Sequence, residues 1–236
     1  AHMATPAVEK EKWAAQPWQS YEEYLALPDD GRVVEWVNGE IVRHMPPTES
    51  HQNIVVFLIA LLRAYVNRLE LGRVFVAPFE VRLWPDGPSR EPDVFFIGRD
   101  KVAQVESRRF SGAPDLVIEV VSPSSVTLDR ITKFQEYERA GVREYWIIDP
   151  RPHQQQADFY VRDDEGQFGP ATIGDDGVYA SSAVPGFRVQ VAWLWPTGPE
   201  ATLPNVDLAL ARMLADAPGI SDELRALYRE MARLLG

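Results

Sequence analysis

The pattern of apolar and polar positions predicts two short elements at the start of the chain. Ser20 and Glu23 have the spacing of a capping box, which predicts the start of a short helix. Farther on, Asn38-Gly39 separates two apolar runs, and this pair is a strong signal of a tight hairpin turn. We therefore expect strands at residues 32–37 and 40–44.

A helical period then replaces the alternation that is typical of strands. Apolar residues between His51 and Leu69 recur at a spacing of three or four, which predicts a long helix. Thr48 or Ser50 is expected to cap its start, and Gly72 to follow its end.

The middle of the chain predicts strands with one helix between the last two of them. Apolar runs predict strands at 73–84, 92–98, 115–121 and 143–150, with a turn-rich connection at 84–91. The helix is expected over 128–141, with Leu128, Ile131 and Phe134 facing inward. This order suits a mixed sheet with helices packed on it.

The last third of the chain predicts additions to this core. Four short runs, at 157–161, 171–174, 178–181 and 187–191, predict antiparallel strands at the sheet edge. Helices are expected near 206–215 and 221–235. The second has an apolar stripe that we expect to pack on the chain's own core, formed by Leu224, Leu227, Tyr228, Met231 and Leu234. The predicted fold class is therefore α/β, a mixed sheet flanked by helices with added antiparallel strands and a C-terminal helical extension.

The composition is that of an ordinary soluble globular protein. The 236 residues, 45% apolar and 25% charged, are enough for one full domain with its own core. A formal net charge of -11 argues against a surface that broadly attracts nucleic acid. A bound polyanion would need a local basic patch, for which the candidates are Arg99, Lys101, Arg108, Arg109 and Arg130.

The absence of cysteine excludes disulfides and thiolate metal sites. A reducing compartment, the cytoplasm, is the location that this composition favours. No apolar run reaches the roughly 18 residues that a membrane-spanning helix needs, and the first residues lack a signal-peptide pattern.

Two acidic residues stand where apolar residues are expected. Glu119 lies in the run "DLVIEVV", and Asp93 follows Pro92 at the start of another apolar run. Burying an unpaired carboxylate costs several kcal/mol, so each acid needs a partner such as a cation or a metal ion. Two carboxylates from neighbouring strands can hold Mg²⁺, with a main-chain carbonyl and waters completing the oxygen shell.

Several motifs resemble one family in combination. The stretches "EPDVFFI", "DLVIEVVSPSS" and "DRITKFQEYERAGVREYWIIDP" are similar to the Uma-two family of restriction-endonuclease-like proteins, in the PD-(D/E)xK nuclease superfamily. The resemblance extends to "VVEWVNGEI", "SHQNIV" and "SSAVPGFRVQV" and covers about residues 18–192. It implies a nuclease-like domain over 18–192, with a helical extension at 193–236 that lies outside the resemblance.

The resemblance also implies a chemistry, which is the hydrolysis of phosphodiester bonds in DNA with Mg²⁺ or Mn²⁺ as cofactor. Asp93 and Glu119 would be the metal ligands. The superfamily motif has a lysine where this chain has Val121, and Lys133 in the next helix looks like the relocated lysine. Lys133 would orient the nucleophile or stabilise the transition state.

Each of these residues also has a simpler interpretation. Glu119 could pair with a nearby arginine or lysine, Asp93 could cap a strand, and Lys133 could form an exposed ion pair with Asp129. The possible accessory residues are Glu35, His51 and Glu80. Glu35 and Glu80 could instead pair with bases, and His51 could be a buried, hydrogen-bonded residue of the long helix.

The sequence thus leaves two functions open. The first is a metal-dependent endonuclease, for which a homodimer is a plausible arrangement by analogy with nucleases that cut two strands. The alternative is a non-catalytic module that uses the nuclease fold to bind nucleic acid or protein.

Overall fold

The structure is a computed structural model that describes residues 19–28, 31–195 and 204–236. Its largest sheet has six strands in the order β11-β10-β9-β8-β6-β3. These strands are β3 (Gly72–Val76), β6 (Val94–Gly98), β8 (Leu116–Val120), β9 (Glu144–Asp149), β10 (Gln156–Arg162) and β11 (Phe168–Pro170). Neighbours β8 and β9 are parallel and the other pairs are antiparallel, so the predicted mixed sheet is confirmed.

A second sheet of five strands has the order β2-β1-β5-β4-β7. Its strands are β1 (Val34–Val37), β2 (Glu40–Arg43), β4 (Glu80–Arg82), β5 (Ser89–Arg90) and β7 (Arg109–Ser111). The predicted hairpin is confirmed, because Asn38 and Gly39 link β1 to β2 with φ values of 50° and 89°. Both values lie in the left-handed region that this turn requires.

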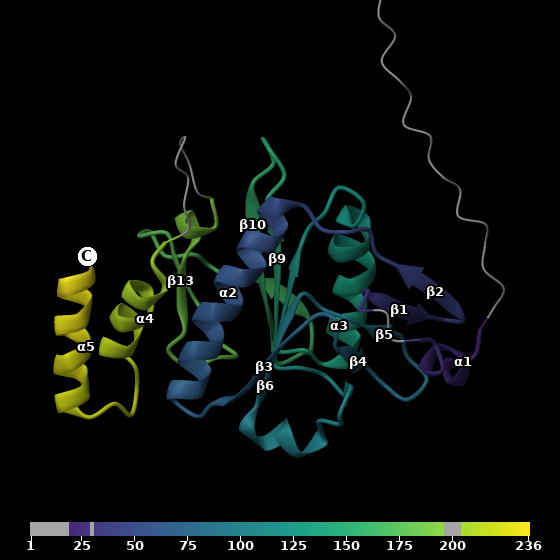
Figure 1. The fold of residues 1–236 in the computed structure, drawn as a ribbon, viewed down its shortest axis with the longest axis horizontal. Coiled ribbons are helices and arrows are strands. Elements are labelled where there is room, and N and C mark those ends of the chain that lie inside the picture. Colours follow the sequence, from purple (N-terminus) through teal and green to yellow (C-terminus); the bar gives the residue numbers. More distant parts are fainter. Residues whose placement is uncertain (1–18, 29–30, 196–203) are drawn as a thin grey trace, which may run out of the picture.

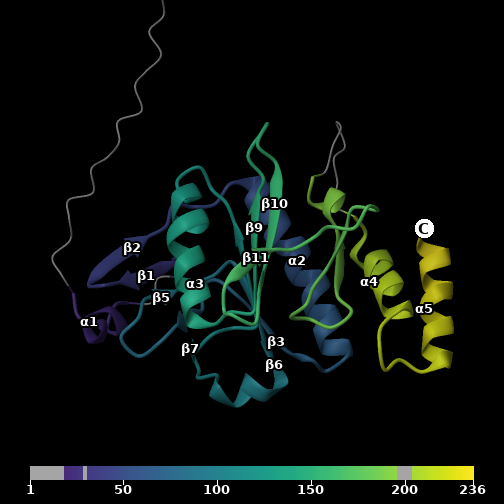
Figure 2. The ribbon, with the colours of Figure 1, turned by 180° about the vertical axis from the view of Figure 1, so that it is seen from behind.

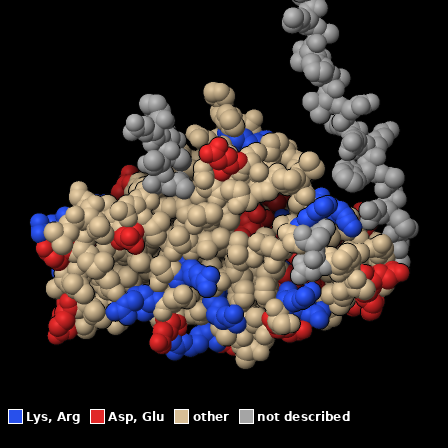
Figure 3. Space-filling model, in the orientation of Figure 1, with Lys and Arg blue, Asp and Glu red and all other residues tan. Residues whose placement is uncertain are grey.

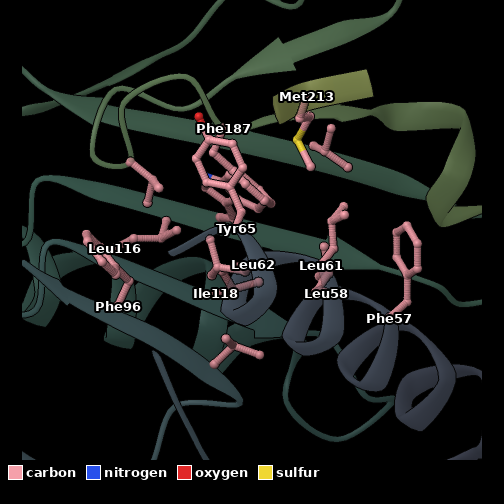
Figure 4. Close-up of a cluster of buried hydrophobic side chains, with 14 of the residues drawn as sticks. Phe57, Leu58, Leu61, Leu62, Tyr65, Phe96, Leu116, Ile118, Phe187 and Met213 are labelled. Atoms are coloured by element: carbon pink, nitrogen blue, oxygen red, sulfur yellow. The ribbon is translucent and has the colours of Figure 1, made fainter. Parts of the chain in front are cut away.

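Helices cover both faces of the six-stranded sheet (Figures 1 and 2). The long helix α2 (Glu49–Arg68) packs on one face, where Leu58 and Leu62 share a core with Ile118 (Figure 4). On the opposite face, α3 (Phe134–Ala140) contributes Tyr137 to a second core. Burial of both faces explains why the strands read as nearly continuous apolar runs.

Smaller elements complete the described chain. They are α1 (Tyr21–Leu25), the 3₁₀ helices η1 (Arg99–Gln104) and η3 (Val191–Leu194), the π-helical η2 (Leu128–Lys133), the pair β12 (Val178–Ala180) and β13 (Arg188–Gln190), α4 (Val206–Ala215) and α5 (Asp222–Leu235). The predicted caps are confirmed: Ser20 and Glu23 form the capping box of α1, and Thr48 caps α2.

Several strand predictions were wrong in detail. The expected strand 73–84 is divided into β3 and β4, which belong to different sheets, because the chain leaves the first sheet after Val76. The turn-rich connection after it contains the short strand β5. The expected strand at 171–174 is absent, and the pairing with β10 is made by β11, a few residues earlier. The strands expected at 178–181 and 187–191 do form, as β12 and β13, but they pair with each other in a separate two-stranded sheet and not at the edge of the large one.

The predicted inward face of the helix over 128–141 is confirmed for Phe134, which packs on the second core, but was wrong for Ile131. Ile131 is 54% exposed, whereas Asp129, Lys133 and Tyr137 are buried. These three residues follow one another at a spacing of four and share one face of η2 and α3. The inward face of this segment is therefore polar in part, and it points toward the acids of β1 and β8.

The C-terminal helices join the core that α2 forms. Ala209, Met213 and Leu214 of α4 belong to that core, and Tyr228 of α5 is buried beside it. The prediction that the whole apolar stripe of α5 packs inward was wrong, since Leu227 is 53% and Leu234 69% exposed. Within the described ranges, no helix combines the length and the apolar character that crossing a membrane requires.

Candidate active site

The register of two strands brings Asp93 and Glu119 together. Val94 of β6 pairs with Ile118 of β8 in antiparallel register, so the next pair along places Asp93 opposite Glu119. The amide of Val120 donates to Asp93 Oδ2 at 2.8 Å and holds that carboxylate at the end of β6.

Both carboxylates line one cavity of about 390 Å³. Its wall also includes Asp129 and Lys133 from η2, and His51 from the first turn of α2. Figure 3 shows a hollow with acidic atoms at its floor, between the start of α2 and the β1–β2 hairpin in the orientation of Figure 1.

Lys133 is the first partner of the buried Glu119. Its Nζ lies 2.9 Å from Glu119 Oε1, and Tyr137 donates its hydroxyl to the same oxygen at 2.7 Å. The same ammonium lies 3.4 Å from Asp129 Oδ1 and 3.6 Å from Glu35 Oε1. The exposed ion pair considered for Lys133 is excluded, because its side chain is buried.

The charge of the cavity wall is negative. Among the described lining residues, the carboxylates of Glu91, Asp93, Glu119 and Asp129 face two permanent cations, Arg32 and Lys133. With every acid counted as ionised, this leaves a formal excess of two negative charges before the histidines are counted.

The protonation of the buried groups reflects this excess. Burial, together with repulsion from Asp129, Asp93 and Glu35, raises the pKa of Glu119 although Lys133 opposes the change. Burial alone would lower the pKa of Lys133, but Glu119, Glu35 and Asp129 outweigh it and hold that pKa well above its ordinary value. The site therefore favours an additional positive charge.

Glu35 connects the cavity to a buried arginine. Its Oε2 lies 2.9 Å from Arg90 Nη1 and 3.0 Å from His44 Nε2, and Arg90 also forms a two-pronged pair with Glu136 of α3. Burial alone would raise the pKa of Glu35, but Lys133, His44 and Arg90 together lower it. Glu35 is thus a charged partner of Lys133 that stands behind the cavity wall.

His51 stands beside Asp93. Its Nε2 lies 3.3 Å from Asp93 Oδ2, and the buried Nδ1 has no hydrogen-bond partner. The cap by Thr48, whose hydroxyl accepts from the His51 amide at 3.3 Å, sets the helix turn that presents this ring. His51 therefore contacts one of the two predicted metal ligands.

Most of the chain, including the part that forms this cavity, matches a known protein family. Residues 21–192 match the family model of Uma2, whose description is "Putative restriction endonuclease". The chain belongs to the Uma2 family. The segment that carries the match includes every residue of the cavity wall.

A solved structure similar to this Uma2 chain is a crystal structure from Anabaena variabilis ATCC 29413, described as "a putative nuclease belonging to DUF820". The two chains are 20% identical and superpose with a TM-score of 0.60, over 74% of this chain and 96% of that one. At this identity the likeness shows a shared fold. No curated protein matches the chain significantly.

One predicted accessory residue of the Uma2 chain lies elsewhere. Glu80 lines a neighbouring cavity and accepts hydrogen bonds from Tyr21 and Ser89, both at 2.6 Å. It is absent from the described wall around Asp93, so its placement in that cleft was wrong. The reason is that β4 belongs to the five-stranded sheet, not to the sheet of Asp93 and Glu119.

The five candidate bases do not gather around the cavity of Asp93 in the described structure. Arg99 pairs with Glu70, Lys101 with Asp115, Arg109 with Glu106, and Arg130 with Asp158. Arg108 and Arg109 line the neighbouring cavity. The five candidates therefore do not form the basic patch that a bound polyanion would need at this site, where Arg32 and Lys133 supply the permanent positive charge of the described wall.

Asp129, Tyr137 and Arg90 were missed as parts of the site. The sequence suggested Asp129 only as an exposed ion-pair partner of Lys133. The spacing of four that places Asp129 and Tyr137 on either side of Lys133 was the available signal. Arg90 carried no comparable signal, because its burial depends on the packing of β5 against β1.

The carboxylates present fit a hard divalent cation. Within the described residues, no group of three or more His, Asp or Glu side chains is arranged to hold a metal ion. Mg²⁺, however, keeps several waters and is commonly held by one or two carboxylates together with substrate phosphate. Asp93 and Glu119 provide that smaller donor set, on a wall with an excess of two negative charges.

Proposed function

We propose that this protein is a metal-dependent endonuclease that hydrolyses the phosphodiester bonds of DNA. Asp93 and Glu119 would hold Mg²⁺ or Mn²⁺, and Lys133 would be the catalytic cation. The observation that carries the proposal is that all three side chains line one cavity, with Lys133 Nζ 2.9 Å from Glu119. Family membership supports the class of reaction.

The bound cation would lower the pKa of a coordinated water and neutralise charge on the phosphoryl oxygens. The chain's own residues supply the rest of the chemistry. Lys133 has three N–H donors and can direct one of them to a phosphoryl oxygen or to the attacking water. Its raised pKa keeps it charged in that role.

The surroundings orient these groups before substrate arrives. The Val120 amide and His51 hold the Asp93 carboxylate, and Tyr137 holds that of Glu119. Because these groups are already in place, the carboxylates need little reorganisation when the reaction begins.

Isosteric variants test the proposal directly. We expect Asp93→Asn and Glu119→Gln each to lower DNA cleavage by about 100-fold or more, because each removes a carboxylate that holds the cation. Cleavage of supercoiled plasmid, single-stranded DNA and RNA by the purified variants measures this, and calorimetry with MnCl₂ measures cation binding. Circular dichroism and thermal melting verify that the variants fold.

Glu80→Gln is the matched control, since Glu80 is also a buried glutamate but lies in the neighbouring cavity. It should leave cleavage and Mn²⁺ binding within about twofold of wild type, as expected away from the site. Wild-type cleavage by both Asp93→Asn and Glu119→Gln would contradict the proposal. Preferential cleavage of RNA would retain the reaction and change the substrate.

The alternative is a non-catalytic module with the nuclease fold. Two observations favour it: Glu119 is already paired with Lys133 and Tyr137, and most of the candidate bases pair with acids away from the cavity. Absence of Mn²⁺ binding by the wild-type protein, together with absence of cleavage, would support this alternative over the enzyme.

A further inference from the structure

Asp129 is a buried acid that the proposed chemistry does not use. The residue is 1% exposed and lines the cavity with Asp93 and Glu119. Its backbone is anchored at both polar groups: the amide donates to Ser125 O at 2.8 Å, and the carbonyl accepts from the Tyr145 hydroxyl at 2.9 Å. The side chain is therefore presented to the cavity from a fixed position.

One oxygen of this carboxylate is incompletely satisfied. Asp129 Oδ1 is buried and has no hydrogen-bond partner among the described residues, where its one ion pair is the 3.4 Å approach of Lys133 Nζ. A buried acceptor without a hydrogen bond is costly, and chains rarely keep one without a use. The use that the geometry indicates is an electrostatic one toward Lys133.

The ammonium of Lys133 has more carboxylate contacts than one ion pair needs. Oxygens of Glu119, Asp129 and Glu35 lie 2.9, 3.4 and 3.6 Å from Nζ. A lysine has three N–H donors and no acceptor. Glu119 Oε1 lies at hydrogen-bond distance, whereas Asp129 and Glu35 attract the ammonium electrostatically from slightly farther away. Glu119 is also a proposed ligand of the cation, and a carboxylate that binds a cation has less charge to offer the lysine.

We propose that Asp129 is a positioning residue that, together with Glu35, holds the ammonium of Lys133 in the cavity independently of Glu119. Glu35 divides its charge among Lys133, Arg90 and His44. Asp129 has Lys133 as its one cationic contact in the described part of the chain. This inference deepens the proposed function, since Lys133 is the cation in both.

The lysine content of the chain allows a test without metal. The lysines are Lys10, Lys12, Lys101 and Lys133, so NMR of the ammonium groups in ¹⁵N-lysine-labelled, metal-free protein gives few signals. In Asp129→Asn, we expect the ammonium protons of Lys133 to exchange with water at least about tenfold faster than in wild type. In Asp129→Glu, which keeps the charge, exchange should remain slow.

The matched control is Asp115→Asn. Asp115 is another buried aspartate, and its Oδ1 lies 2.9 Å from Lys101 Nζ. This variant should accelerate exchange at Lys101 and leave Lys133 as in wild type. Glu119→Gln should also keep the Lys133 protons slow, since Asp129 and Glu35 remain.

Kinetics give the second measurement. Asp129→Asn should lower kcat for DNA cleavage by about 10-fold to 100-fold, because a displaced catalytic group reacts poorly. The KM for DNA and the calorimetric Kd for Mn²⁺ should stay within about twofold, since Asp129 is not proposed to bind either.

Three results would overturn the inference. One is slow exchange of the Lys133 ammonium protons in Asp129→Asn. Another is fast exchange of the same protons in Glu119→Gln, a result that can be measured even if Asp129→Asn does not fold. The third is a loss of Mn²⁺ affinity in Asp129→Asn as large as that in Asp93→Asn, which would make Asp129 a ligand. If the NMR result holds while wild type neither binds Mn²⁺ nor cleaves DNA, the positioning role stands and the proposed function fails.

Discussion

At the scale of single residues, two buried glutamates differ in how fully their oxygens are hydrogen-bonded. Glu144 of β9 accepts hydrogen bonds on both oxygens, from the side chains of Trp146, Tyr179, Ser181 and Ser182 and from the amides of Ser182 and Ala183. Glu119 of β8 accepts from one hydroxyl, pairs with one ammonium and lines a cavity. Glu144 is saturated, so it stabilises the loop that it binds, whereas Glu119 keeps capacity for a ligand.

Glu144→Gln should therefore destabilise the protein strongly. The amide group would set N–H donors against the donors that now surround the carboxylate, and we expect a loss of about 3 kcal/mol in the free energy of unfolding. Urea denaturation measures it. The control is Glu165→Gln at an exposed position, which should change stability by less than about 0.5 kcal/mol. Equal effects of the two substitutions would contradict this account of Glu144.

At the scale of elements, the start of α2 joins the core to the site. The helix buries Leu58, Leu61 and Leu62 against the six-stranded sheet, and its first turn presents His51 to Asp93. A cap that orders this turn therefore affects both stability and the cavity. The start of α5 has a similar cap, in which Ser221 accepts from the Leu224 amide, but it lies far from the start of α2 (Figure 1).

Thr48→Ala should lower the free energy of unfolding by about 1 kcal/mol, because the amide of His51 loses its acceptor. Hydrogen exchange should show faster opening of the first turn of α2. Ser221→Ala is the matched control, and its faster exchange should be confined to the start of α5. If Ser221→Ala opened the first turn of α2 equally, the local role of the Thr48 cap would be wrong.

At the scale of the whole molecule, the charge distribution limits how nucleic acid can bind. The net charge is -11, and Figure 3 shows basic and acidic groups interspersed over the face that carries the hollow. Arg99, Lys101, Arg109 and Arg130 pair with acids away from the cavity, so these described bases form no basic stripe that leads to it. A protein of this kind should engage few phosphates at a time.

We therefore expect DNA binding by the Asp93→Asn variant to depend weakly on salt, with a log–log slope no steeper than about -3. Fluorescence anisotropy across a series of NaCl concentrations measures the slope. Adding Arg32→Gln should reduce its magnitude by about 1, since Arg32 lines the cavity. Adding Arg99→Gln, at an exposed pair with Glu70, should leave it unchanged. A slope near -8 would show an extensive phosphate interface that contradicts this picture.

The sequence predicted those features that depend on neighbours along the chain. Asn38-Gly39 predicted the hairpin because the turn itself demands positive φ, and Thr48 predicted the start of α2 because a cap acts within one turn. It failed where an apolar pattern fits two arrangements. The run 73–84 suits a strand in either sheet. For the helix after β8, the apolar residues predicted which face lies inward, but the buried face carries Asp129 and Lys133.

By itself, the sequence determined that Glu119 needs a partner, since a carboxylate amid aliphatic neighbours is too costly to bury alone. Only the tertiary structure decided which groups meet it. The register of β6 and β8 brought Asp93 opposite, the π-helical turn brought Lys133 and Asp129 inward, and the separation of β4 into another sheet removed Glu80. Distances between residues far apart in sequence follow from packing, which no local pattern specifies.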